Sequence, residues 1–259
     1  MRLLARIKEF GYARERAAVA ALALSYFCVL YGLIAFGAPV ELRPWRAAFA
    51  ALASCYITAF LGLASGWFWA RWFASGLAWS GAMMGLAGLV MVGWQPAVAI
   101  YGALHGAVVI LLGGPKMAER YEGQAGWRER FRVDDFGVGR VRKYVTRAAA
   151  ALPGLILWAL APRDQGALVS GGLAVLVLAA GAGVLRGRTW GLLATCSAAG
   201  ALAWGGMSAV SAGVSSAGWP GVLVHAGASA GAIAAAVLLA AAAAPFVGPA
   251  VRYFRSLPR

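Results

Sequence analysis

Residues 17–38 read AAVAALALSYFCVLYGLIAFGA, an unbroken run without a charged side chain. About 20 apolar residues in a helix are enough to cross the hydrocarbon core of a bilayer. Comparable blocks follow at residues 47–64, 73–92, 95–114, 144–161, 166–185, 189–211 and 219–247. The block at 144–161 is the weakest, because its uncharged part begins only after Arg147. The pattern predicts an all-α, polytopic membrane protein with about eight transmembrane helices.

The composition agrees with this class. Apolar residues make up 62% of the chain and charged residues 12%, whereas an ordinary soluble domain has roughly 45–50% and about 25%. The net charge is +14. In a membrane protein such an excess collects in the cytoplasmic loops, so we expect membrane lipids rather than nucleic acid as the partner of these charges.

The distribution of basic residues predicts the topology. With eight spans and a cytoplasmic N-terminus, the inside segments are the N-terminal tail, the loop at Arg71, residues 115–147, the turn at residues 186–188 and the C-terminal tail. They carry 5, 1, 9, 2 and 3 basic residues, whereas the outside loops carry only Arg43, Arg46 and Arg163. This asymmetry predicts a bacterial-type inner (plasma) membrane protein with both termini in the cytoplasm.

A short signature occurs twice, as EFGYARER at residues 9–16 and DFGVGRVR at residues 135–142. Further pairs follow in the same order: Gly85 and Gly206, Gly93-Trp94 and Gly218-Trp219, Gly114-Pro115 and Gly248-Pro249. We therefore predict two tandem four-helix repeats, residues 1–121 and 135–259, joined by a cytoplasmic linker at 122–134. Because each repeat has an even number of spans, a pseudo-two-fold axis along the membrane normal would relate them.

The doubled signature also supplies candidate surface residues. The tail before residue 17 places Leu3, Ile7 and Phe10 on one helical face, which predicts a short interfacial helix. A phenylalanine and two arginines recur at matched positions ahead of the first and fifth blocks, and these positions either seat the chain at lipid headgroups or form a two-fold surface for a protein partner. These residues are Phe10, Arg14, Arg16, Phe136, Arg140 and Arg142.

The two histidines, His105 and His225, both lie inside predicted spans. An ionisable residue within a membrane is a functional-site hypothesis by default. Symmetric ligation of a haem would need the two to be equivalent. However, the glycines around them align at an offset that separates the histidines by five helical positions, about 7.5 Å along the axis. We therefore expect hydrogen-bonded core histidines, keep both as weak cofactor candidates, and predict no cofactor and no metal.

Glycine pairs spaced for close helix packing occur in the fourth and eighth blocks, at Gly102 with Gly106 and at Gly227 with Gly231. A GxxxG spacing lets two helix backbones approach closely within a membrane. Because the two pairs occupy matched positions, we expect these helices to pack tightly, on each other across the repeat interface.

The sequence favours a protein without chemistry of its own. The apolar blocks contain no Asp, Glu or Lys, and the chain has no Walker A, CxxCH or HExxH motif. The leading hypothesis is a non-catalytic accessory or scaffold subunit that binds other membrane-protein subunits. Two alternatives stay open: a carrier or channel for a small or lipophilic solute, and a b-type haem protein or other membrane enzyme using His105 or His225.

Overall fold

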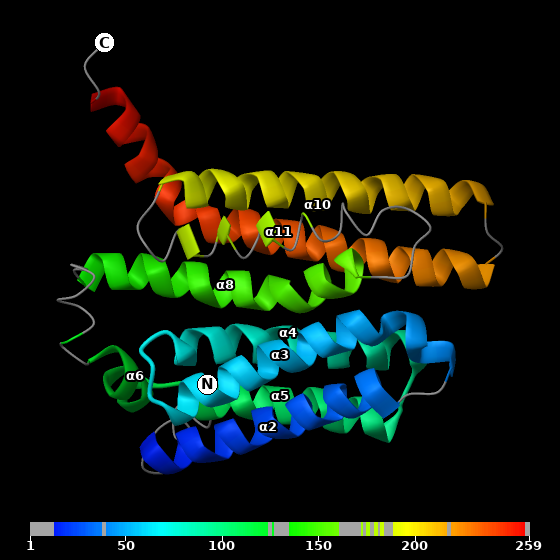
Figure 1. Cartoon of the computed structure of the whole chain (residues 1–259), viewed down its shortest axis with the longest axis horizontal. Coiled ribbons are helices and arrows are strands. Elements are labelled where there is room, and N and C mark those ends of the chain that lie inside the picture. The colour runs from blue at the N-terminus through cyan, green and yellow to red at the C-terminus, as the bar shows by residue number, and fades with distance from the viewer. Residues whose placement is uncertain are drawn as a thin grey trace. The chain divides into compact units, whose positions relative to one another are not determined.

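The computed structural model shows a chain built from long helices (Figure 1). It describes residues 13–37, 40–123, 126, 135–160, 172, 175–176, 179–180, 182–183, 189–216 and 219–256. Throughout these ranges the regular structure is helical. The all-α class predicted from the sequence is thus confirmed for the described part of the chain.

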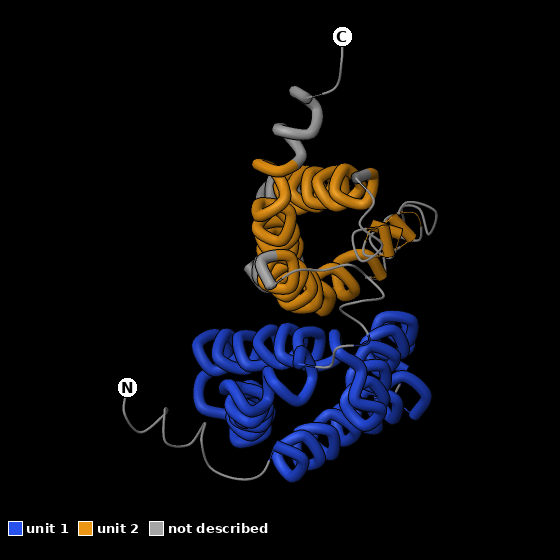
Figure 2. Tube along the Cα trace, turned by 90° about the vertical axis from the view of Figure 1, so that its left-hand side faces the viewer, with its two compact units in different colours: residues 1–134 blue, residues 135–259 orange. Residues whose placement is uncertain are grey.

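The chain divides into two compact units, unit 1 at residues 1–134 and unit 2 at residues 135–259 (Figure 2). Unit 1 contains α2 (Ala13–Gly37), the 3-10 helix η1 (Val40–Trp45), α3 (Arg46–Ala64), α4 (Ala70–Val92), α5 (Pro96–Leu112) and α6 (Pro115–Glu122). Unit 2 contains α8 (Asp135–Ala159), α10 (Thr189–Ser216) and α11 (Trp219–Ser256).

Glycine and proline set the helix ends in unit 1. Helix α4 stops at Gly93, whose φ of 78° is a left-handed conformation that glycine adopts without steric cost. Pro96 then opens α5, at a position where the proline's missing N–H has no helical partner to lose. At the other end of α5, Gly114 has a φ of 97°. Pro115 follows it as the first residue of α6, which lies at 72° to α5.

The core of unit 1 lies where α2 packs on α3 and α5, and α4 packs on α5. Its largest fully buried side chains include Leu24, Phe27, Tyr56, Trp72 and Leu77. The backbones of α4 and α5 come close together where Gly85 faces Gly102, because a Cβ added to Gly85 would lie 2.5 Å from the Gly102 Cα. Small residues at this crossing bring the aromatic face of α5 into the core.

In unit 2, α11 packs against both α8 and α10. A Cβ on Gly154 of α8 would lie 2.8 Å from the Gly231 carbonyl oxygen of α11. A Cβ on Gly206 of α10 would lie 3.2 Å from the Ser229 carbonyl oxygen, also on α11. Both helix pairs of this unit therefore use glycine to bring their backbones together.

Among the residues that the structure describes, four stretches are long and apolar enough to cross a membrane: Ala13–Gly37, Leu42–Ala64, Ala70–Val92 and Ser229–Pro249. The bent pair α5 and α6 makes a fifth if it is one broken span. The outward faces suit lipid, since Leu22, Phe36 and Val90 are 66%, 80% and 80% exposed. The described residues thus form an all-helical chain with the apolar helices of a multi-pass membrane protein.

The helices coincide with most of the predicted apolar blocks, although fewer of them qualify as spans. Helix α8 carries Arg140, Arg142, Lys143 and Arg147, so its uncharged part is too short to qualify by itself. The block at 166–185 and the expected interfacial helix before Ala13 lie largely outside the described residues. The eight-span count and the internal repeat therefore stay predictions.

Candidate functional site

His105 is the fully buried polar centre of unit 1, on α5. Its Nδ1 lies 2.8 Å from the Tyr101 carbonyl oxygen one turn earlier, and its Nε2 lies 2.7 Å from the Tyr56 hydroxyl of α3. Because a carbonyl oxygen only accepts, Nδ1 carries the proton and donates it to Tyr101. Nε2 is then the acceptor, and the Tyr56 hydroxyl donates to it. Both ring nitrogens of this neutral imidazole are thus occupied.

Aromatic rings from α2, α3 and α5 surround this histidine. The Phe27 ring of α2 stacks on the imidazole with 3.7 Å between ring centroids and 27° between the planes. Tyr31, one turn further along α2, shares a 2.8 Å hydrogen bond with the Tyr101 hydroxyl and stacks on Tyr56. We call these five residues, Phe27, Tyr31, Tyr56, Tyr101 and His105, the aromatic cluster.

Gly81 of α4 lies against the aromatic cluster and leaves room for the His105 ring because it has no side chain. A Cβ built on Gly81 would overlap the His105 ring at Cδ2, Nε2 and Cγ. A side chain at this position would collide with the imidazole that reaches Tyr56, so glycine is needed here. The α4–α5 crossing at Gly85 and Gly102, one turn away, fixes the same close approach.

A second polar site lies at the C-terminus of α5. Arg16 of α2 donates from Nη2 to the carbonyl oxygens of Ile110 at 2.9 Å and Gly113 at 2.7 Å. Arg71 of α4 donates from Nε to the Leu112 carbonyl at 2.9 Å. The last carbonyls of a helix have no intrahelical donor, and the partial negative charge there favours cations. Two guanidinium groups therefore cap one helix end.

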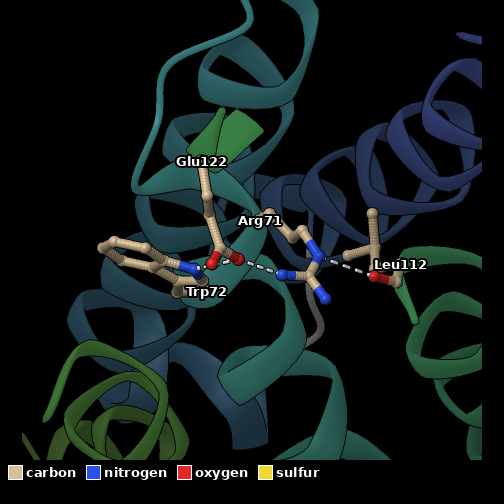
Figure 3. A network of polar contacts seen from close by, with 4 residues as sticks. All are labelled: Arg71, Trp72, Leu112 and Glu122. Atoms are coloured by element: carbon tan, nitrogen blue, oxygen red, sulfur yellow. Dashed lines mark hydrogen bonds and ion pairs between the residues drawn. The ribbon is translucent and has the colours of Figure 1, made fainter. Parts of the chain in front are cut away.

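Arg71 also holds α6 in place (Figure 3). Glu122, the last residue of α6, forms an ion pair with Arg71 and accepts a 2.7 Å hydrogen bond from the Trp72 indole N–H. Tyr121 donates to the Leu63 carbonyl at the end of α3, 3.0 Å away. We call Arg16, Arg71, Trp72, Tyr121 and Glu122 the end cluster. It ties α2, α3, α4 and α6 to the end of α5.

Polar contacts also join the described helices of unit 2. Arg147 of α8 donates from Nη1 to the Ala241 carbonyl of α11 at 2.5 Å. The Tyr144 hydroxyl lies 3.0 Å from Thr195 Oγ1, which donates to the Gly191 carbonyl at 2.8 Å. These contacts join α8 to α11 through the half-buried Arg147 and to α10 through the buried Tyr144 and Thr195.

The structure separates the arginines that the sequence grouped together. Arg16 is buried, with 5% of its surface exposed, and works inside the unit. Arg14 and Arg142 are exposed, and Arg140 is half-buried. Phe10 lies outside the described residues, and Phe136 is placed only as part of the α8 backbone. Matched positions in the proposed repeat thus have different surroundings.

The predicted histidine and glycine sites are described only in part. His225 and Gly227 lie in α11, within a stretch where the side-chain environment is not described. Gly102 contacts Gly85, and Gly231 contacts Gly154, so each of these two packs on a neighbouring helix of its own unit. A Cβ on Gly106 would meet nothing within 4 Å, so its surroundings leave room for a side chain.

Sequence reasoning missed the partners of His105. Phe27 and Tyr31 are spaced four residues apart, as are Tyr101 and His105, so each pair lies on one helical face. That spacing is the signal that marks two aromatic faces meeting in a core. Gly81 gave no comparable signal, because it is one of 35 glycines in the chain.

The donor chemistry limits what these sites can bind. Within the described residues, no three His, Cys, Asp or Glu side chains gather as metal ligands. The Nε2 lone pair of His105 already accepts from Tyr56, so a haem iron or a metal ion would first have to displace that hydroxyl.

The chain matches no protein-family model, no curated protein and no solved structure. The class that can be stated is therefore an all-helical chain with membrane-compatible helices.

Proposed function

We propose that the chain is a non-catalytic subunit of a larger membrane assembly, serving as a helical scaffold. The observation that carries this proposal is that the chemistry-bearing side chains in the core of unit 1 bind one another or the backbone. His105 has both nitrogens occupied, and Glu122 holds Arg71 and Trp72 together. Groups engaged in this way hold helices in register and present no open donor set to a substrate.

The proposal includes an architecture of eight spans in two four-helix repeats, in a bacterial-type inner membrane with both termini in the cytoplasm. One similarity between the units supports the repeat. In each unit an arginine of the first long helix donates to a backbone carbonyl of the last: Arg16 of α2 to Ile110 of α5, and Arg147 of α8 to Ala241 of α11. The two arginines do not occupy matched positions, because the repeat pairs Arg16 with Arg142, so the similarity is one of helix order only.

The glycine contacts give a second similarity. Gly85 of α4 faces α5, and Gly206, its partner in the proposed repeat, faces α11. In unit 1 the third long helix approaches the fourth through a glycine, and in unit 2 α10 approaches α11, which are third and fourth in the proposed order of spans, in the same way. A duplicated four-helix unit accounts for both similarities, because a common ancestor would have carried the same helix-packing order.

The proposed partners are other membrane-protein subunits, docked at the cytoplasmic side. Arg14 is exposed and Arg140 half-buried, so both can be reached by a partner. Phe10 and Phe136 are the matched aromatic residues of the same proposed surface. Arg16 is excluded from it, because its guanidinium is used within unit 1.

The test is purification of the tagged chain from its native membranes in mild detergent, with mass measurement of the intact particle. A scaffold subunit should elute in a particle of fixed stoichiometry with other membrane proteins. Charge reversal at Arg14 and Arg140 together should release those proteins, whereas reversal at Arg43 and Arg46, exposed basic residues of η1 and α3, should not. A chain that elutes alone and is stabilised by a solute would favour the carrier instead, and a Soret band would favour the haem protein.

A further inference from the structure

Helix α11 contains two prolines in its interior, Pro245 and Pro249, with Gly248 beside the second. A proline has no backbone N–H, so the carbonyl four residues earlier in the helix loses its donor. Pro245 thus leaves the Ala241 carbonyl without its helical bond, and Pro249 does the same to the Pro245 carbonyl. Because these positions are spaced four residues apart, both missing bonds lie on one face of α11. The helix bends most easily at this point.

Arg147 of α8 supplies the donor that Pro245 lacks. Its Nη1 donates at 2.5 Å to the Ala241 carbonyl, which is the acceptor that the proline leaves free. Prolines are tolerated inside membrane helices where neighbouring helices satisfy the freed backbone groups. A guanidinium suits this role, because it is always charged and its hydrogen bonds are stronger than those of neutral donors. The contact therefore pairs one arginine of α8 with one proline of α11.

Helix α8 also contacts α11 beyond the proline. Tyr144, three residues before Arg147, packs edge-on against Phe246 with 6.0 Å between ring centroids and 87° between the planes. Positions three apart are neighbours on a helix surface, so one face of α8 holds α11 on both sides of Pro245. In Figure 1 the C-terminal part of α11 turns away from α8. This direction is expected when the missing bonds face α8, because the helix opens on that side.

We propose that Pro245 is a hinge in α11 and that Arg147 is its latch. The hinge lets residues 246–256 change direction relative to the rest of the helix, and the arginine holds them at one angle by replacing a lost backbone bond. Arg147 is half-buried, so its guanidinium can leave the carbonyl without the core opening. Residues 240–244 are all alanine, so little side-chain bulk opposes the motion. The hinge needs no partner subunit, so this proposal and the scaffold proposal can fail separately.

The experiment measures the direction of the C-terminal part of α11 by double electron–electron resonance on the full-length protein in detergent. The three native cysteines are replaced by alanine, and spin labels are attached at K143C on α8 and R252C beyond the hinge. The control pair is K143C with V237C, an exposed position of α11 before the hinge. The arm from residue 245 to residue 252 is about 10 Å long, so a 30° change of direction moves its label by about 5 Å.

The wild type should give one narrow distance distribution for each label pair. R147M keeps a side chain of similar length but has no donor, so it should broaden the K143C/R252C distribution and add a second population displaced by about 5 Å. The K143C/V237C distribution should not change. R147K keeps a donor and should resemble the wild type. P245A restores the backbone N–H, so it should shift the K143C/R252C distance to one new value at which R147M has no further effect.

Three results would overturn the proposal. An unchanged K143C/R252C distribution in R147M would mean that the arginine does not hold the bend. An equal change in the control pair would show general loosening of α8 from α11. An R147M effect as large in P245A as in the wild type would mean that the arginine does not act through the proline. If R147M does not fold, recovery of folding in R147M/P245A supports the pairing, and failure of both variants overturns it.

Discussion

Tyr56 donates its hydroxyl proton to Nε2 of His105 across 2.7 Å, at a point where both side chains are buried almost completely. The contact joins α3 to α5, and its polar atoms lie among the rings of Phe27, Tyr31 and Tyr101. In an apolar environment an unmatched polar atom is costly, so this pair favours the one helix arrangement that satisfies it. The Tyr56–His105 hydrogen bond therefore determines how α3 and α5 align more than it raises the free energy of unfolding.

Replacing Tyr56 with Phe tests the energetic value of this contact. The ring is kept, and only the donor to His105 Nε2 is lost, so we expect unfolding in mixed micelles to become easier by about 0.6–1.7 kcal/mol. A double-mutant cycle with His105→Phe isolates the pair. If Tyr56→Phe costs the same with and without the histidine, the hydrogen bond contributes nothing.

Gly81→Ala tests the close approach of α4 to the imidazole. The new methyl would overlap the His105 ring, and overpacking of this kind costs about 1–3 kcal/mol. Combining the change with His105→Ala should recover most of the loss, because the smaller side chain makes room. Gly32→Ala is the control: nothing lies within 4 Å of its added Cβ, so it should be neutral or stabilising. Equal losses at both glycines would contradict the predicted overlap.

The sequence predicted the helices well because a charge-free block is read directly from the chain. The blocks at 17–38, 47–64 and 73–92 agree with α2, α3 and α4 to within a few residues. What the blocks do not encode is which faces meet. Helices α2, α3 and α4 have apolar residues all round, so the periodicity that marks the buried face of a soluble helix is weak in them.

The candidate site was predictable only in outline. His105 was expected to be hydrogen-bonded, but its partner Tyr56 is 49 residues away and lies on another helix. The end cluster was harder to foresee. Arg16 and Arg71 look in the sequence like ordinary cytoplasmic charges, and only the three-dimensional arrangement places both at the C-terminus of α5. A basic residue that caps a helix and one that meets lipid headgroups have the same sequence signal.

Glu122→Gln should loosen the end of unit 1. The amide removes the ion pair with Arg71 and weakens the acceptor of the Trp72 indole, and we expect a loss of about 1.5–3 kcal/mol. Limited proteolysis near α6 should become faster, because Glu122 is a main anchor of that helix. Glu119→Gln, on the exposed side of α6, should change stability by no more than about 0.5 kcal/mol. The same loss in both variants would indicate a general charge effect.

A substitution at Ser229 is predicted to keep or raise stability, unlike the substitutions above. Its side chain is fully buried in α11, and within the described residues its hydroxyl has no hydrogen-bond partner. Ser229→Ala removes a polar atom that is costly to bury and adds helix propensity, so stability should stay level or rise by about 1 kcal/mol. Thr195→Val is the contrast, because it loses the contacts with Tyr144 and Gly191. A destabilised Ser229→Ala would mean that this hydroxyl does have a partner.

Reporter fusions test the number of spans. In the eight-span proposal, residues 38–45 lie outside and the turn at residues 186–188 lies inside, as does the C-terminus after Arg259. A periplasm-dependent phosphatase should therefore be active after Pro39 and inactive after Arg188 and Arg259, and a cytoplasm-dependent fluorescent protein should show the reverse. The decisive fusion is after Arg163, between the blocks at 144–161 and 166–185. An active phosphatase there means that α8 crosses the membrane despite its four basic residues. An inactive one, with the C-terminus still inside, would remove both of those spans, leaving six and breaking the four-plus-four repeat.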